Sequence, residues 1–262
     1  MTRDDTWDPD QYHRFRAERS APFFDLLALV QPVDAPRMAD LGCGTGELTA
    51  DAHRVLGARE TVGIDRSEAM LEPARALDVD GLTFALGDIA IFAPTEPFDV
   101  VISNAALQWI PDHPAVLARW TAALTDHGQL AVQMPTNADH ASHRLSAEVA
   151  REQPFLDAFA GEPPADPVLG VAKPEEYAVL LDALGFTEQH VRLQVYPHHL
   201  ASTADVVEWV KGTSLTRFKA LLPNDLYALF LERYTERLVA ALGAERPYFY
   251  AFKRILFWAR LP

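Results

Sequence analysis

Residues 39–46 read Ala-Asp-Leu-Gly-Cys-Gly-Thr-Gly, the most informative segment of the chain. It follows a short approach at 36–38 and precedes a helix-like run at 47–56, so a strand ends in a glycine turn that opens a helix. Glycine lacks the Cβ atom that blocks close backbone approach, and the start of a helix presents unpaired N–H groups to a ligand. The turn therefore predicts a nucleotide-binding site.

The spacing of the glycines separates two kinds of nucleotide fold. The dinucleotide fingerprint is G-x-G-x-x-G, but here Glu47 stands where its last glycine would be. Glycines at 42, 44 and 46, with Asp40 before them, form a G-x-G-x-G turn that resembles the first motif of class I S-adenosylmethionine (SAM)-dependent methyltransferases. The resemblance implies an α/β, Rossmann-like fold. This fold has a mostly parallel seven-stranded sheet with helices on both faces, and we expect a helical lid inserted near the C-terminus.

Composition narrows the class of protein further. The chain has 262 residues, of which 49% are hydrophobic, which suits one large α/β domain. A net charge of −14 argues against nucleic acid as a partner, although a few arginines in a pocket can still bind a small anion. The single cysteine, Cys43, fits a reducing compartment. No membrane-spanning run or secretory signal is recognisable, so we expect a cytoplasmic protein with no membrane partner.

Strand and helix signals alternate along the first half of the chain. Strand-like segments at 61–64, 82–86, 98–102 and 128–134 are separated by helical segments after Ser67 and at 116–124, which predicts βαβ units. Beyond Pro135 we expect helices at 173–184, 203–212 and 224–242, and strands at 191–196 and 249–261. The predicted organisation is one domain, residues 1–262. Its core spans 23–197 and 248–262, and its cap is formed by a helix at 8–30 and the insertion 198–247.

Acidic residues follow the strand-like segments at positions suited to an adenosine. Asp65 lies about 25 residues after Asp40, close to the spacing of ribose-binding acids, and Asp88 is placed to accept from the adenine amino group. Each acid taken alone could instead be a helix cap or turn residue. The predicted cofactor-binding residues are Asp40, Gly42, Cys43, Gly44, Gly46, Asp65, Arg66, Met70, Asp88, Ile89, Asn104, Ala105 and Trp109.

A longer set of segments resembles the trans-aconitate 2-methyltransferase family nearly end to end. They are residues 7–12, Asn-Ala-Ala-Leu-Gln-Trp-Ile-Pro-Asp-His at 104–113, Val-Gln-Met-Pro at 132–135, and 252–257; the chain departs from the family at 155–168 and around 221–225. The resemblance implies direct in-line transfer of a methyl group from SAM to a carboxylate of trans-aconitate. A carboxylate is already ionised at neutral pH, so we expect no catalytic acid or base, only positioning by Asn104 and Gln108.

A polycarboxylate needs cationic and polar contacts. Arg254 is the strongest candidate because it lies in an apolar strand, where an unpaired charge is costly, although an edge-strand arginine that reaches solvent is the alternative. Trp109 in turn could simply pack in the core. The predicted substrate-binding residues are Tyr12, Arg19, Gln108, His198, Trp209 and Arg254.

Several alternatives stay open at this point. The acceptor could be another small acid, and the chain could also be a Rossmann oxidoreductase or a non-catalytic SAM-binding protein. His140 and His143 share a helix face but have no cysteine or acidic partners in the sequence pattern, so we predict no metal. We expect a monomer or weak homodimer with a small-molecule polycarboxylate as its partner.

Overall fold

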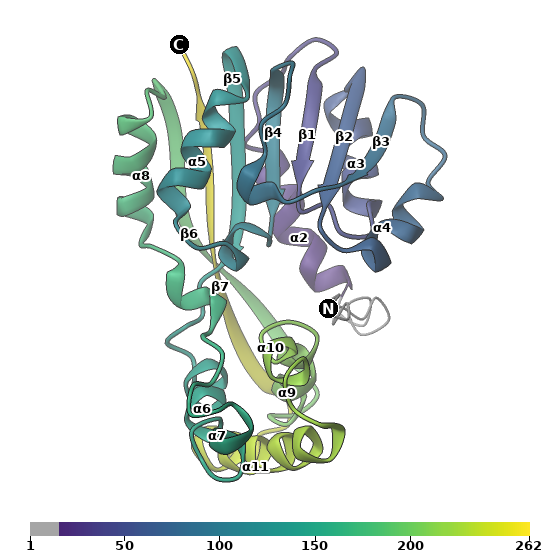
Figure 1. The fold of residues 1–262 in the computed structure, drawn as a ribbon. Helices are drawn as coiled ribbons and strands as arrows, with labels where there is room; N and C mark the ends of the chain where they lie inside the picture. Colours follow the sequence, from purple (N-terminus) through teal and green to yellow (C-terminus); the bar gives the residue numbers. More distant parts are fainter. Residues whose placement is uncertain (1–15) are drawn as a thin grey trace. The chain divides into compact units, whose positions relative to one another are not determined.

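Seven strands form one sheet in the order β3-β2-β1-β4-β5-β7-β6 (Figure 1). The computed structural model describes residues 16–262, with side chains from Ser20 onward. Strands β1 to β5 pair in parallel, and β7 runs antiparallel to β5. The strands are β1 Arg37–Leu41, β2 Glu60–Asp65, β3 Leu82–Leu86, β4 Phe98–Asn104, β5 Leu124–Pro135, β6 Glu188–Leu200 and β7 Tyr248–Arg260. The predicted mostly parallel seven-stranded sheet is confirmed.

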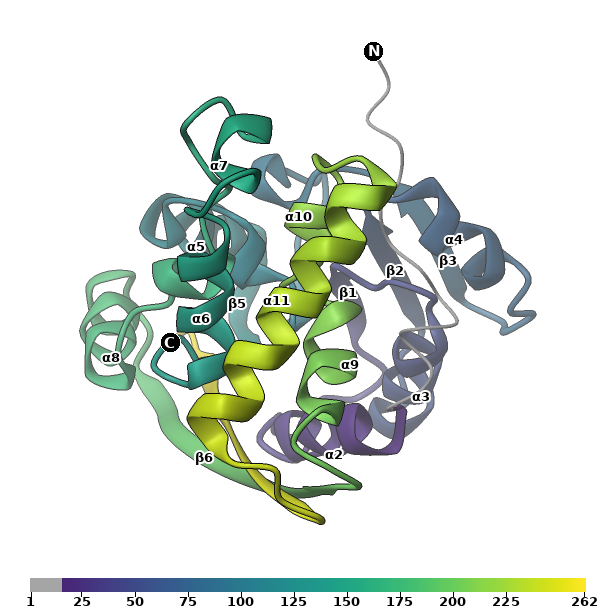
Figure 2. The ribbon, with the colours of Figure 1, turned by 90° about the horizontal axis from the view of Figure 1, so that it is seen from below.

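Helices cover both faces of this sheet. Figures 1 and 2 show α5 and α8 on one face and α2 and α3 on the other. On the first face, Trp120 of α5 and Tyr177 of α8 are fully buried with Phe257 of β7 in the same apolar core. The helices are α2 Arg16–Leu27, α3 Glu47–Leu56, α4 Glu68–Arg75, α5 His113–Ala122, α6 Ala141–Val149, α7 Phe155–Ala158, α8 Pro174–Ala183, α9 Asp205–Lys211, α10 Thr216–Lys219 and α11 Asn224–Leu242, with short 3-10 turns η1 Ile89–Ile91, η2 Leu107–Trp109 and η3 Pro167–Gly170.

The chain divides into two compact units. The sheet unit comprises residues 17–135, 170–194 and 254–262, and the described part of the helical unit comprises 136–169 and 195–253 with Arg16. The helical unit has its own core, because Phe230, Tyr234 and Leu238 recur at four-residue spacing on α11 and are fully buried. The proposed division into a single domain with a cap stays a prediction.

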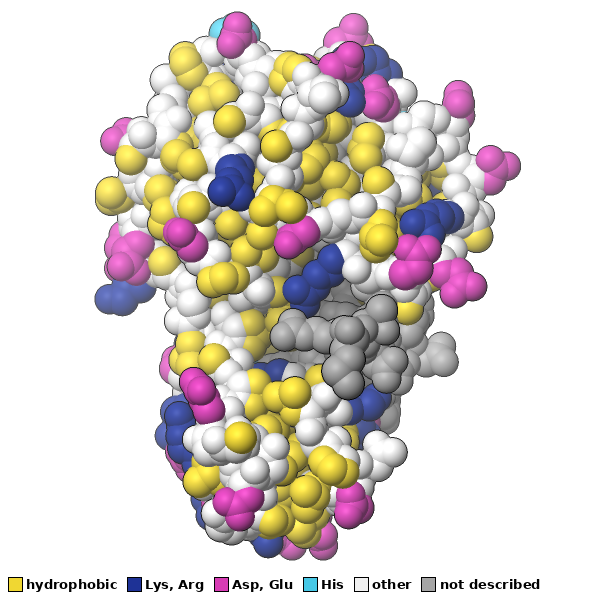
Figure 3. Space-filling view, in the orientation of Figure 1, with side chains coloured by type: hydrophobic (Ala, Val, Ile, Leu, Met, Phe, Trp, Pro, Cys, Tyr) yellow, Lys and Arg dark blue, Asp and Glu magenta, His cyan; other side chains and the backbone are white. Residues whose placement is uncertain are grey.

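On the face seen in Figure 3 the negative charge is dispersed. Acidic side chains lie scattered among apolar and neutral ones over the face seen in Figure 3. Among the helices from residue 16 onward, none is both long and apolar enough to cross a membrane.

Candidate active site

The glycine turn between β1 and α3 has a backbone that other residues tolerate poorly. Gly42, Gly44 and Gly46 have φ values of 88°, 56° and 75°, all in the left-handed region that favours glycine. A Cβ atom on Gly42 would lie 2.2 Å from the Cβ atom of Ala106. The turn is held to β2, because the N–H groups of Gly42 and Cys43 donate to the carbonyl oxygen of Ile64 at 2.8 and 3.1 Å. The glycines therefore let backbone, rather than side chains, form the surface of the turn.

The register of the sheet places five polar side chains on one face. Asp40 pairs with Gly63 and with Ile102, so Asp65 and Asn104, two residues further along their strands, project to the same side as Asp40. Asn104 pairs with Gln133, and Pro135, two residues on, pairs with Arg254. Two of the predicted cofactor acids, Asp40 and Asp65, thus share one face of the sheet with the predicted substrate arginine, in a row that runs along the carboxyl ends of β2, β1, β4 and β5 to Arg254 of β7. We call Asp65, Asp40, Asn104, Gln133 and Arg254 the polar row.

Asp65 is fixed by the turn that it follows. Its Oδ2 atom accepts from the N–H of Gly44 at 2.9 Å, and its Oδ1 atom accepts from the N–H of Ser67 at 2.9 Å. Each carboxylate oxygen has a further lone pair, so the half-buried group keeps capacity to accept ribose hydroxyls. Asp65 therefore acts as a turn residue, which was its alternative role. Because its oxygens can accept further hydrogen bonds, ribose binding by Asp65 stays a prediction.

Asp40 is buried at the end of β1. Only 3% of the residue is exposed, and its Oδ2 atom accepts from Thr49 Oγ1 at 2.6 Å. Burial raises the pKa of the Asp40 carboxyl to about 7; the Thr49 hydrogen bond opposes the rise and the charge of Asp65 adds to it. Asp40 is therefore easily protonated near neutral pH.

The remaining residues predicted to bind adenine lie beyond β2 and β3. Asp88 is exposed and caps η1, with its Oδ1 atom accepting from the N–H of Ala90 at 2.9 Å, while Ile89 is buried. The buried Met70 side chain reaches the turn, since its Cε atom lies 3.2 Å from where a Cβ of Gly44 would be. Arg66 is exposed at the start of α4. For Asp88 the cap role is observed, and its adenine role stays a prediction.

The end of β4 and the loop after it carry buried amide oxygens without hydrogen-bond partners among the described residues. Ala105 has a φ of 54°, and its N–H donates to the carbonyl oxygen of Gln133 at 2.8 Å. The amide nitrogen of Gln108 donates to the carbonyl oxygen of Ala105 at 2.7 Å, while Gln108 Oε1 and Asn104 Oδ1 are buried with no hydrogen-bond partner among residues 16–262. Trp109 is half-buried rather than a full member of the core. Two amide oxygens in this loop are therefore available to a ligand.

Arg254 is buried and paired with a glutamine that the sequence analysis did not select. The residue is 5% exposed, so the alternative of an arginine that reaches solvent is wrong. Its Nη1 atom donates to Oε1 of the fully buried Gln133 at 3.0 Å, and Gln133 Nε2 has no hydrogen-bond partner in the described part of the chain. The signal in the sequence that could have identified Gln133 is that a polar residue stands within the apolar run of β5. Gln133 orients the guanidinium and leaves one amide donor for a ligand.

Four other predicted substrate residues lie outside the described side chains of the sheet unit. His198 and Trp209 belong to the helical unit, where their rings lie 4.8 Å apart and Trp209 is buried. Tyr12 lies outside the described residues, and Arg19 lies on α2 with its side chain outside them. Their predicted substrate contacts stay predictions.

His140 and His143 have partners other than a metal. His140 Nε2 lies 3.1 Å from the hydroxyl of Tyr248, and His143 Nδ1 lies 2.8 Å from Asp166 Oδ2. Arg217 also pairs with Asp166, at 3.1 Å. No group of three or more histidine, cysteine or acidic side chains within residues 16–262 is arranged to hold a metal ion.

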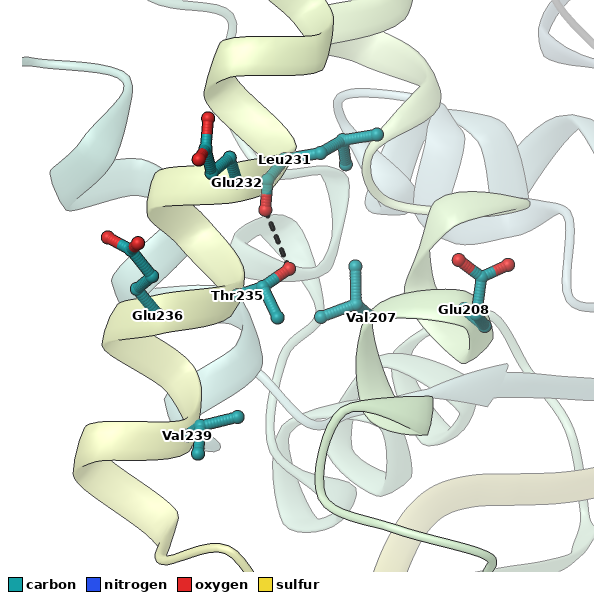
Figure 4. A pocket seen from close by; sticks show the side chains of 7 residues that line it. All are labelled: Val207, Glu208, Leu231, Glu232, Thr235, Glu236 and Val239. Atoms are coloured by element: carbon teal, nitrogen blue, oxygen red, sulfur yellow. Dashed lines mark hydrogen bonds between the residues drawn. The ribbon is translucent and has the colours of Figure 1, made fainter.

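A groove in the helical unit has the wrong chemistry for an anionic substrate. It lies between α9 and α11, with Val207, Leu231 and Val239 on its apolar surface (Figure 4). Glu208, Glu232 and Glu236 also line it, and they would repel a carboxylate. The polar row of the sheet unit is therefore the better candidate for acid binding.

The strand order, the left-handed glycine turn and the acid at the end of β2 together define a class I SAM-dependent methyltransferase. The comparisons agree. A methyltransferase domain model matches residues 33–177. The trans-aconitate 2-methyltransferase of Deinococcus radiodurans is 43% identical over 258 residues, which cover 98% of this chain and 99% of the relative. That of Methylobacterium radiotolerans is 41% identical over 237 residues, 90% of each chain. The YcgJ protein from Bacillus subtilis has a similar fold, with a TM-score of 0.60, 14% identity and coverage of 92% of this chain and 98% of that one.

The chain belongs to the trans-aconitate 2-methyltransferase family. It is a SAM-dependent methyltransferase. Two alternatives from the sequence, a Rossmann oxidoreductase and a non-catalytic SAM-binding protein, are therefore rejected. The residues fit this cofactor: the absence of a Cβ on Gly42 lets the loop after β4 pack against the turn at Ala106, and Asp40 Oδ1 is buried without a hydrogen-bond partner among the described residues.

We expect Asp65→Ala to weaken SAM binding by roughly 1–3 kcal/mol, the cost of losing a charged acceptor and of releasing the Gly44 N–H. Isothermal titration calorimetry with SAM measures this loss. Asp99→Ala is the matched control, because Asp99 accepts from the N–H of Arg37 at 2.8 Å near the amino end of β4. The control should lower stability and leave the SAM affinity unchanged. Unchanged SAM affinity in Asp65→Ala would contradict its assignment to the ribose.

Proposed function

We propose that the protein methylates a carboxylate of trans-aconitate and forms a monomethyl ester. The relatives that cover nearly the whole chain carry this activity in their names. The observation within the chain that supports it is the buried Arg254–Gln133 pair, together with the buried amide oxygens of Asn104 and Gln108, which have no hydrogen-bond partner in the part of the chain that the structure describes. A small, highly charged acid needs this combination of a fixed cation and neutral polar groups.

Residues of β1, β2 and the glycine turn would hold the cofactor. When bound, SAM supplies an electrophilic methyl carbon attached to a sulfonium. The turn offers backbone at Gly42 and Gly44, and Asp65 offers carboxylate oxygens that its two amide contacts keep in place. These contacts would hold the carboxylate in place for the ribose, and a site held in its binding geometry lowers the entropy cost of binding.

The acceptor acid would be bound at the other end of the polar row. The guanidinium of Arg254 presents a planar pair of donors to a carboxylate, and Gln133 Nε2 adds a neutral donor. Both residues are almost completely buried, so this contact is formed away from water, where electrostatic attraction is stronger. Binding one carboxylate here would leave another free to face the methyl group.

Catalysis would then consist of positioning and desolvation. A carboxylate with a pKa near 4 is ionised at neutral pH, so the nucleophile needs no general base. Asn104 and Gln108 would keep the acceptor close to the turn, and in-line alignment can lower a barrier by several kcal/mol. Water must be excluded from the nucleophile, because hydration masks its charge.

A methyl-transfer assay tests the acceptor. Radiolabelled SAM is incubated with trans-aconitate, cis-aconitate, citrate or isocitrate, and the ester is identified by mass spectrometry. We expect trans-aconitate to have the highest kcat/KM. Methylation of a different acid would replace the acceptor assignment with the second candidate, another small carboxylic acid, and no methylation of any would reject the polycarboxylate class.

A further inference from the structure

Asp40 is a buried acid of the cofactor site that methyl transfer itself does not use. Its Oδ2 atom accepts a single hydrogen bond, from the neutral hydroxyl of Thr49 at 2.6 Å. Its Oδ1 atom is buried and has no hydrogen-bond partner in the chain from residue 16 onward. A carboxylate that is removed from water and given one neutral donor is poorly stabilised in its charged form.

The ionisable groups around Asp40 make its charged form less favourable still. Asp65 at the end of β2 repels it, and burial together with both aspartates raises the pKa of the Cys43 thiol, so that group is neutral. His53 on α3 lies one turn after Thr49, but its Nδ1 atom is engaged with Thr61 Oγ1 at 2.8 Å. On β4 the neighbour is the apolar Ile102, and among the described residues no cation contributes to the pKa shift of Asp40. These surroundings raise the pKa of Asp40 to about 7.

We propose that Asp40 holds a proton in the cofactor-free protein and releases it to solvent when SAM binds at the glycine turn. The carboxyl O–H bond breaks, its electron pair stays on the carboxylate, and the proton passes to the buffer. SAM carries a sulfonium, an ammonium and a carboxylate, hence a net positive charge. A cation beside Asp40 supplies the favourable interaction that the chain itself does not give, and so stabilises the ionised form.

The direction of the pH dependence follows from this linkage. Proton release on binding means that SAM affinity increases with pH between the pKa values of the bound and free protein. With a free pKa of about 7, the Kd should fall by about tenfold between pH 6 and pH 8 and level off above that range. The proposal concerns the cofactor and not the acceptor, so its test is independent of whether trans-aconitate is methylated.

Calorimetry in two buffers of different ionisation enthalpy counts the released protons. The α-amino group of SAM titrates in the same range, since such groups have a pKa of about 7.7–8.0 in general. The Asp40→Asn variant has nearly the same shape and no ionisable group at this position. Its proton release on SAM binding therefore measures the contribution of the ligand's own amino group. We expect the wild-type protein to release about half a proton more than Asp40→Asn at pH 7. Equal proton release by the two proteins would overturn the proposal.

Thr49→Val gives a second test that leaves Asp40 in place. Removing the hydroxyl removes the one bond that favours the ionised carboxyl, so the midpoint of the SAM affinity–pH curve should move to higher pH. Thr121→Val is the control, because Thr121 Oγ1 bonds the Leu117 carbonyl within α5 at 2.8 Å; its midpoint should not move. A loss of affinity in Thr49→Val that is the same at every pH indicates packing alone and contradicts the proposal.

Infrared difference spectroscopy observes the proton directly. At pH 6 the cofactor-free wild-type protein should show the carbonyl band of a protonated buried carboxyl, and the band should disappear on addition of SAM. The same band should be absent in Asp40→Asn. A wild-type spectrum without the band, or with a band that SAM leaves unchanged, would overturn the proposal.

Discussion

Replacing Gly42 with alanine should abolish most SAM binding and destabilise the fold. The new Cβ atom would lie 2.2 Å from Ala106 Cβ, so either the turn or the loop after β4 must move. Left-handed backbone costs a residue with a Cβ about 1–2 kcal/mol, and overpacking adds about 1–3 kcal/mol. We expect stability to fall by roughly 2–5 kcal/mol and the Kd for SAM to rise on the order of 100-fold, since 1.4 kcal/mol is tenfold. Urea unfolding and calorimetry measure the two effects.

Gly57→Ala separates backbone strain from the crowding at the turn. Gly57 also has a left-handed φ, 61°, but a Cβ there would have no atom within 4 Å. This variant should lose about 1–2 kcal/mol of stability and keep the wild-type affinity for SAM. If both glycine variants lose SAM affinity to the same extent, the crowding at Gly42 is not what shapes the cofactor site.

Arg254→Ala should raise the KM for the acceptor acid strongly while SAM affinity stays within about twofold. Losing a charged, buried hydrogen-bonding group costs about 1.5–3 kcal/mol, which is roughly a 10- to 150-fold change in KM. Arg254→Lys keeps the charge but loses the planar pair of donors, so it should recover only part of the loss. Initial-rate kinetics with varied acceptor, and calorimetry with SAM, provide the measurements.

Arg260→Ala is the matched control on the same strand. Arg260 pairs with Gln31 Oε1 at 3.0 Å near the opposite end of the β5–β7 ladder. Its replacement should lower stability without changing the KM for the acceptor. A rise in KM in this control as large as in Arg254→Ala would show that the strand, and not the guanidinium of Arg254, determines the effect.

Much of the fold could be predicted because local signals and tertiary structure agree. The helices at 47–56 and 224–242 and the strand at 82–86 have the predicted bounds. The apolar pattern predicts a strand at 191–196, but β6 spans Glu188–Leu200. Strand β6 lies at one end of the sheet order, and Glu188, Gln189 and His190 are exposed, so its polar ends lack the apolar alternation of a buried strand.

The site was predictable only where spacing along the chain determines it. Asp40 and Asp65 could be selected because Asp40 is the last residue but one of β1, next to the glycine turn, and Asp65 ends β2, next to the Ser67 helix cap. Gln133 and Thr49 are neutral residues whose importance depends on which strand or side chain lies beside them. The burial of Arg254 likewise follows from the antiparallel pairing of β7 with β5, which no local pattern specifies. The sequence alone does not specify the register between distant strands, and this register determines which side chains lie next to one another in the site.

The polar row has a consequence for how such an enzyme can change its substrate. Under the proposed function, β1 and β2 hold the cofactor end of the row and β5 and β7 hold the acceptor end. Substitutions at Gln133 or Arg254 can therefore alter the acid that is recognised while the methyl donor stays the same. Deleting one residue inside β5 would instead turn Gln133 to the opposite face of the sheet. Acceptor specificity can thus diverge through point substitutions in these strands, whereas changes of length are confined to the loops.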